Sequence, residues 1–167
     1  MAKLARKWYA QFLSPPGETE NWAVLGVDND DLKKELSPQT ETKKNVLGET
    51  AFVHNGYEVQ VAVEPYYADE SSPLHDPLLD IIMTEDNSEA KCLGKYADVV
   101  FDAFTEATGI FTGVAFIQDA WIVPQSIGGD TSGVQIPFNI NPVGPKTQKN
   151  ISYNVATHTP TFTAIGG

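Results

Sequence analysis

Apolar and polar residues alternate along much of this chain with a period of two, the pattern of strands that bury one face. The alternation is clearest in residues 57–64, 96–104 and 134–141. Residues 113–123 are apolar nearly throughout and predict a central strand covered on both sides. Pro137 lacks a backbone N–H, so its strand is expected at an edge or with its donor side turned away from a partner. Weaker patterns predict further strands at 9–13, 22–27, 42–47, 151–155 and 161–165.

One stretch has the period of a helix instead. Leu74, Leu78, Ile81 and Ile82 lie at i, i+4, i+7 and i+8 and form a single apolar stripe, which predicts a helix over residues 74–83. A helix this short is marginal alone in water, so it must pack on a sheet. Many short strands with one helix indicate a mainly β fold, either a sandwich or a barrel.

Segments rich in Gly, Pro, Asn and Ser separate the predicted strands. Residues 14–17 are expected to connect a hairpin, residues 54–56 to form a turn, and residues 127–130 and 142–145 to form loops. Residues 28–50 are too polar for a core strand and predict a long loop. Loops of this length in compact domains are usually functional or disordered.

The charge of the chain narrows the classes of function. The 167 residues predict a single domain over 1–167, with 22 acids against 11 lysines and arginines and a formal charge of −11. Every acid lies between Glu18 and Asp130. Such a chain should not adhere to nucleic acid, because that binding depends on clustered cations that displace counterions from phosphates. The acids form either an ordinary solvated surface or a surface that must repel something.

Motifs of catalysis and metal binding are missing from the sequence. His54, His75 and His158 have no ligand spacing, and Ser126 is not in a GxSxG motif. Cys92, the only cysteine, is expected to be a small buried side chain. We therefore expect no enzyme, no cofactor and no metal site. We also expect no membrane span and synthesis in a cytoplasm, because no signal-peptide core and no stretch of about 18 apolar residues is found.

Several ordered segments resemble one known family, the major tail (tail tube) proteins of long, non-contractile-tailed phages and prophages of Gram-positive bacteria. No single segment is a catalytic signature, and together they run from about residue 22 to residue 141. The segments are ELSP (35–38), ETKKNVLGET (41–50), HNGYE (54–58), VEPYYAD (63–69), DAWIVPQS (119–126), GGDT (128–131) and IPFNIN (136–141).

The resemblance implies a fold of two packed β sheets with one flanking helix, here residues 74–83. It also implies that residues 28–50 contain a long inter-ring loop, with residues 1–8 as an N-terminal arm and 146–167 as a C-terminal segment. Six subunits would form a ring, rings would stack into the tail tube, and genomic DNA would pass through the lumen without specific binding. The expected partners are further copies of the chain and the tape measure, tail tip and tail terminator proteins. The expected location is the virion tail, assembled in the host cytoplasm.

Two sets of residues follow as candidates for sites in such a tube. Acids on the lumen wall would repel phosphate over a distance near the Debye length of about 8 Å. An outer-surface position is the alternative for each of them. The candidate lumen acids are Glu58, Glu64, Asp98 and Asp102.

Inter-subunit contacts form the second set. A basic N-terminal arm could dock on an acidic loop of a neighbouring subunit; the alternative is a frayed, solvated terminus. The candidate contacts are Lys3, Arg6, Lys7, Asp28, Asp30, Asp31, Lys43 and Lys44.

Two other functions fit the sequence. The chain could be a tube subunit of a contractile phage-tail-like particle, which uses a related fold. It could also be a β-sandwich module that binds a carbohydrate or another ligand.

Overall fold

The computed structural model describes residues 3–17, 19–27, 29 and 32–165. In chain order the elements are the 3-10 helix η1 (Arg6–Trp8), β1 (Tyr9–Ser14), β2 (Ala23–Val24), β3 (Lys34–Glu35), β4 (Pro38–Lys44), β5 (Thr50–Tyr57), β6 (Gln60–Val63), α1 (His75–Thr84), α2 (Glu89–Cys92), β7 (Leu93–Thr105), β8 (Ile110–Pro124), β9 (Gly128–Asp130), β10 (Gly133–Gln135), β11 (Phe138–Asn154) and β12 (Thr159–Ala164).

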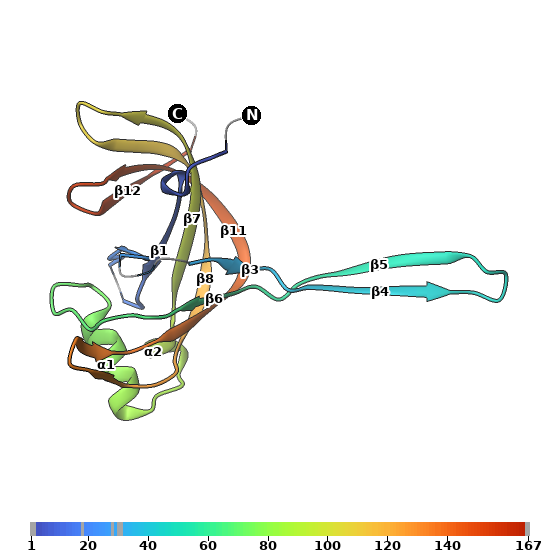
Figure 1. Ribbon diagram of the computed structural model, residues 1–167, viewed down its shortest axis with the longest axis horizontal. Coiled ribbons are helices and arrows are strands. Elements are labelled where there is room, and N and C mark those ends of the chain that lie inside the picture. The colour runs from blue at the N-terminus through green and yellow to red at the C-terminus, as the bar shows by residue number, and fades with distance from the viewer. Residues whose placement is uncertain (1–2, 18, 28, 30–31, 166–167) are drawn as a thin grey trace.

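Three long strands, β7, β8 and β11, form the centre of an antiparallel sheet (Figure 1). The full sheet has eight strands in the order β2-β1-β7-β8-β11-β6-β3, and β12 also pairs with β11. The first residues of β11 pair with β6 and the last pair with β12. A register shift between Val143 and Thr147 separates these two parts of β11. The long strands therefore extend through two halves of the molecule.

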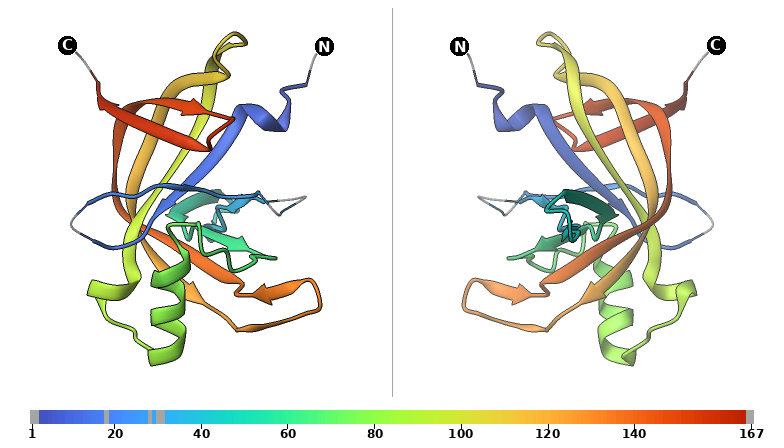
Figure 2. Two further views of the ribbon diagram at one scale, coloured as in Figure 1. Left: turned by 90° about the vertical axis from the view of Figure 1, so that its left-hand side faces the viewer. Right: turned by 90° about the vertical axis from the view of Figure 1, so that its right-hand side faces the viewer.

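The two halves bury opposite faces of this sheet. Successive side chains of a strand point to opposite faces. On β7, Tyr96 belongs to one buried cluster and its neighbour Ala97 belongs to another. On β1, Leu13 and Phe12 divide between the same two clusters. The first cluster includes Leu78 of α1, whereas the second joins residues of β1, β7, β8 and β11 and is flanked by Val24 of β2 and Phe162 of β12. Figure 2 shows α1 at one end of the long strands and β12 at the other.

The predicted mainly β fold with a packed helix is confirmed. The prediction of two packed sheets is not, because the body contains one large sheet. One continuous eight-stranded sheet contributes residues to both buried clusters, and β4–β5 and β9–β10 are separate two-stranded sheets. The predicted helix is α1, which buries Leu78 and Ile81. The short helix α2 was not predicted.

The polar stretch predicted as a loop is largely strand in its described part. Residues 28–50 contribute β3, β4 and the start of β5, and the turn predicted at 54–56 lies inside β5. The strand predicted at 42–47 ends at Lys44. Both faces of these strands are exposed, so their sequence carries no alternation that could reveal them.

Two other strand predictions need correction. The central position of β8 is confirmed, but the strand is not covered on both sides. Buried residues alternate with exposed ones along it, and Val114, Phe116 and Val123 are 37%, 41% and 39% exposed. The strand predicted at 134–141 divides into β10 and β11, and Pro137 lies between them, where its missing N–H interrupts no ladder. Of the four apolar residues that alternate here, Ile136, Phe138 and Ile140 are buried, whereas Val134 is 50% exposed.

Candidate assembly interface

A long hairpin, β4–β5, extends away from the rest of the chain (Figure 1). Strands of seven and eight residues, at about 3.3 Å per residue, give it a length of roughly 25 Å. Every residue of β4 is exposed, and in β5 only Val53 and Gly56 are partly covered. The hairpin therefore has no support from its own core.

The tip of the hairpin is an ordered turn. The Oδ1 atom of Asn45 accepts hydrogen bonds from the backbone N–H groups of Leu47 (2.9 Å) and Glu49 (3.0 Å), and its Nδ2 donates to a Glu49 carboxylate oxygen (2.8 Å). Gly48 adopts a φ of 81°, which favours glycine. This turn displays two apolar side chains, since Val46 is fully exposed and Leu47 is 78% exposed.

The two faces of the hairpin differ in chemistry. The register pairs Thr42 with Phe52 on one face, and Phe52 is 67% exposed. The other face pairs Glu41 with Val53. The Nζ atom of Lys43 lies 3.3 Å from Glu41, but such an exposed ion pair stabilises little. An isolated two-stranded hairpin is at best marginally stable in water, so a partner surface is needed to hold this one in shape.

The four candidate lumen acids do not share one surface. Glu58 follows the hairpin and Glu64 follows β6, and both are exposed. Asp102 is exposed at the register shift of β7. It borders a depression on the bare sheet face whose other side chains are uncharged, among them Thr112, Asn150 and Thr163.

Asp98 was predicted as a candidate lumen acid, but its side chain is buried, and this position does not suit an acid that lines a pore. Its Oδ2 atom lies 2.6 Å from Nζ of Lys34 and accepts a hydrogen bond of 2.9 Å from the Tyr9 hydroxyl. Burial, and next the charge of Asp98, raise the pKa of Tyr9 above its ordinary value. The ion pair joins β3 to β7 across the sheet, and Asp98 thus has a structural role. The sequence could not reveal it, because Lys34 comes from a polar stretch 64 residues away.

The basic N-terminal arm is partly held by its own chain. Arg6 donates through Nη2 to the backbone oxygen of Leu32 (2.9 Å) and through Nη1 to that of Tyr9. Lys7 lies over the Phe104 ring, with Nζ 5.9 Å from its centroid. Lys3 is exposed. The acidic residues predicted as a docking partner, Asp28, Asp30 and Asp31, lie outside the described residues.

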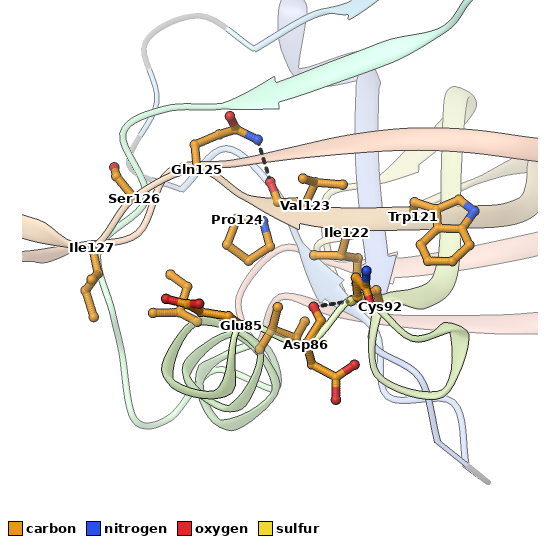
Figure 3. Close-up of a pocket in the computed structure, with 13 residues that line it drawn as sticks. Glu85, Asp86, Cys92, Trp121, Ile122, Val123, Pro124, Gln125, Ser126 and Ile127 are labelled. Atoms are coloured by element: carbon orange, nitrogen blue, oxygen red, sulfur yellow. Dashed lines mark hydrogen bonds between the residues drawn. The ribbon is translucent and has the colours of Figure 1, made fainter.

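A groove between α1 and the end of β8 is the second prominent surface (Figure 3). It is an open cavity of about 460 Å³. Its walls are mostly apolar, and Glu85 and Asp86 contribute carboxylates at its border. Cys92 is buried here, as predicted, and donates from Sγ to the Asp86 backbone oxygen (3.3 Å) while burial raises the pKa of its thiol. No sequence signal predicted the groove, which joins segments about 40 positions apart.

Neither a scan against models of known protein families nor a search of curated proteins finds a match to this chain. The tail-tube family named from the sequence therefore stays a prediction. Within the described part of the chain, neither helix is long and apolar enough to cross a membrane.

Proposed function

We propose that this chain is the structural subunit of the tail tube of a non-contractile phage. Copies of it close into hexameric rings, the rings stack, and genomic DNA passes through the lumen toward the host. The resemblance of residues 22–141 to major tail proteins supports this proposal. The chain acts by assembly and not by catalysis, with tape measure, tail tip and tail terminator proteins as further partners. Assembly takes place in the host cytoplasm, and the virion tail is the final location.

One observation carries the proposal: the β4–β5 hairpin extends roughly 25 Å from the body, and its residues are exposed apart from the partly covered Val53 and Gly56. An isolated two-stranded hairpin is only marginally stable in water, so this hairpin is expected to need a partner surface. The hairpin overlaps residues 28–50, where the resemblance places a long inter-ring loop. A docking surface on another copy would bury its apolar side chains and supply the missing stabilisation.

A second exposed surface is the bare sheet face, the face of β7 and β8 that lies opposite the second buried cluster. Val100, Val114 and Phe116 are exposed on the outside of the second half of the sheet. A sheet with an uncovered apolar area of this kind, and with exposed edge strands, is suited to contacts with neighbouring copies. With Asp98 buried, Glu58, Glu64 and Asp102 remain as the candidates for acids that repel DNA in the lumen.

Removal of the hairpin tests this function. The N–H of Glu58 donates to the backbone oxygen of Ser37 (3.3 Å), so the base of the hairpin is closed and residues 38–57 can be replaced by two glycines. The shortened chain is expected to fold with unchanged circular dichroism of the body and to stay monomeric in sedimentation. The full chain is expected to form rings or tubes, visible by negative-stain microscopy.

Each outcome of that experiment is informative. Tubes formed by the shortened chain would show that the hairpin is dispensable for assembly. A full chain that remains monomeric at high concentration, even beside preformed tail tips, would contradict the tail-tube function.

A ligand-binding module is the second candidate function, and the groove of about 460 Å³ is the observation in its favour. Its volume falls within the range of small-molecule sites, and Trp121 and Asp86 are both among the residues that line it. Saccharide affinity of a stable monomer, measured by calorimetry, would favour this candidate over the tube.

A further inference from the structure

The apolar tip of the hairpin is preorganised for binding. Asn45 fixes the turn through three hydrogen bonds, which hold Val46 and Leu47 outward. A segment that is already in its bound shape loses little conformational entropy on binding. Burial of two aliphatic side chains favours association, because it removes apolar surface from water. The tip is thus suited to fill an apolar recess.

The groove beside α1 provides such a recess. Ile81 and Ile82 come from the helix, and Ile122, Pro124 and Ile127 come from the end of β8 and the residues that follow it. Ile127 is 46% exposed at the border. The cavity of about 460 Å³ is open to solvent and has room for two aliphatic side chains.

Charges on the two surfaces are complementary. Lys43 and Lys44 precede the tip, whereas residues 75–92, which form α1 and α2, contain five acids and a single lysine. That lysine, Lys91, pairs with Asp80 at 2.8 Å. Among the described residues, neither Glu85 nor Asp86 has an ion-pair partner.

Local complementarity is necessary here because the copies repel one another overall. Residues 38–57 contain two lysines and two acids, so the rest of the chain carries the whole charge of −11. The hairpin is therefore the segment that approaches an acidic surface with the least repulsion, and opposite charges set the orientation of the contact.

The groove of the same chain is out of reach. The hairpin leaves the body on the side away from α1, and its tip is the point farthest from that helix (Figure 1). A tip that fills a groove must therefore fill the groove of another copy.

We infer that the β4–β5 tip of one copy binds the groove between α1 and the end of β8 of another copy. Val46 and Leu47 enter the cavity, and Lys43 and Lys44 face Glu85 and Asp86. The inference rests on the proposed function, because it names the two surfaces through which copies join.

A charge exchange tests the pairing. K43E/K44E and E85K/D86K are each expected to raise the protein concentration needed for assembly by roughly tenfold, as about 1.4 kcal/mol per contact would do. The chain that carries all four changes keeps the native net charge and is expected to regain assembly. K33E/K95E is the control that matches K43E/K44E in charge. Both lysines lie outside the hairpin and the groove and lose only exposed ion pairs, so this variant is expected to assemble like the native chain.

Cross-linking tests the location directly. L47C/I127C is expected to form disulfide-linked chains upon oxidation of assembled material. L47C/N150C, which places the second thiol on the bare sheet face, is expected to form none. V46S/L47S changes only exposed side chains, so the chain should stay folded by circular dichroism while assembly is lost.

The outcomes separate the inference from the proposed function. Tubes formed by V46S/L47S at native concentrations, cross-links from position 47 to position 150, or no recovery in the fourfold variant would overturn the tip-to-groove contact and leave the tail-tube function standing. A native chain that never assembles would overturn both.

Discussion

The body of the molecule and its β4–β5 hairpin are built from the same antiparallel pairing but depend on different surroundings. In the body, Phe12 and Leu13 are fully buried on opposite faces of β1, so a single strand stabilises two cores. In the hairpin, every residue of β4 is exposed. We therefore expect the body to fold alone, whereas the hairpin gains its stabilisation from contacts with other copies.

The largest expected effect is a contrast between two phenylalanines. Phe12 packs edge-on against Tyr153 (5.2 Å) and Phe162 (6.3 Å), and Phe12→Ala is expected to lower the free energy of unfolding by about 3–5 kcal/mol. Phe52→Ala is expected to change it by less than about 0.5 kcal/mol, because that ring is exposed, and yet to weaken assembly. Urea denaturation of both monomers, followed by sedimentation, measures the contrast. Equal losses of stability would mean that the hairpin belongs to the core.

A smaller effect is expected at the ion pair that joins β3 to the sheet. Lys34→Met leaves the buried Asp98 carboxylate with the Tyr9 hydroxyl alone and is expected to cost about 3 kcal/mol of unfolding free energy. Lys34→Met combined with Asp98→Leu should recover most of this loss, since no charge is then left buried. Lys33→Met, at an exposed ion pair one residue earlier, is the matched control and should change little. Thermal denaturation of the four chains would contradict the idea if the single and double changes at the buried pair were equally harmful.

The sequence predicts those elements of the fold that bury one face, because only these elements have periodic apolar residues. Residues 134–141 and 74–83 were found because their apolar residues repeat with the period of the element. The hairpin was missed apart from a weak strand prediction at 42–47, because neither of its faces is buried and a polar strand then resembles a polar loop. Alternation on β7 placed Asp98 and Asp102 on one solvent face, but the register shift after Phe101 and the ion pair to Lys34 separate them.

The candidate interface was predictable only in part. Lys43 and Lys44 were named as contacts, and they do lie on an exposed segment. The groove was not foreseen, since Glu85 follows a helix and Ile127 follows a strand, and only the tertiary fold brings the two together. The periodicity of a segment indicates its secondary structure and its buried face, but not which distant segment it contacts.

A pH titration should distinguish the body further from the hairpin, with a more modest effect. Burial raises the pKa values of Tyr9, Tyr96 and Tyr153, so these hydroxyls stay protonated in the folded chain above the ordinary value of about 10. Above pH 10 the unfolded chain binds fewer protons, and stability must fall, by about 1.4 kcal/mol per pH unit for a fully buried tyrosine such as Tyr96. Tyrosinate absorbance should therefore rise together with unfolding. Ionisation of all tyrosines before any loss of ellipticity would contradict this expectation.

The smallest effect on the body is expected at the tip itself. Asn45→Ala removes the three side-chain hydrogen bonds of the turn and should leave the melting temperature unchanged, because the tip takes no part in either core. Amide hydrogen exchange of Leu47 and Glu49 should accelerate, since their N–H groups lose their acceptor. Assembly should weaken although no contact residue is altered, because the turn would then have to be ordered upon binding. Asn45→Asp combined with Glu49→Gln serves as the control, because it keeps the oxygen acceptor at position 45 and replaces the facing carboxylate by an amide donor; it should preserve slow exchange at both amides. A lowered melting temperature in Asn45→Ala would place the tip inside the cooperative unit of the body, and the division between the two regions would then be wrong.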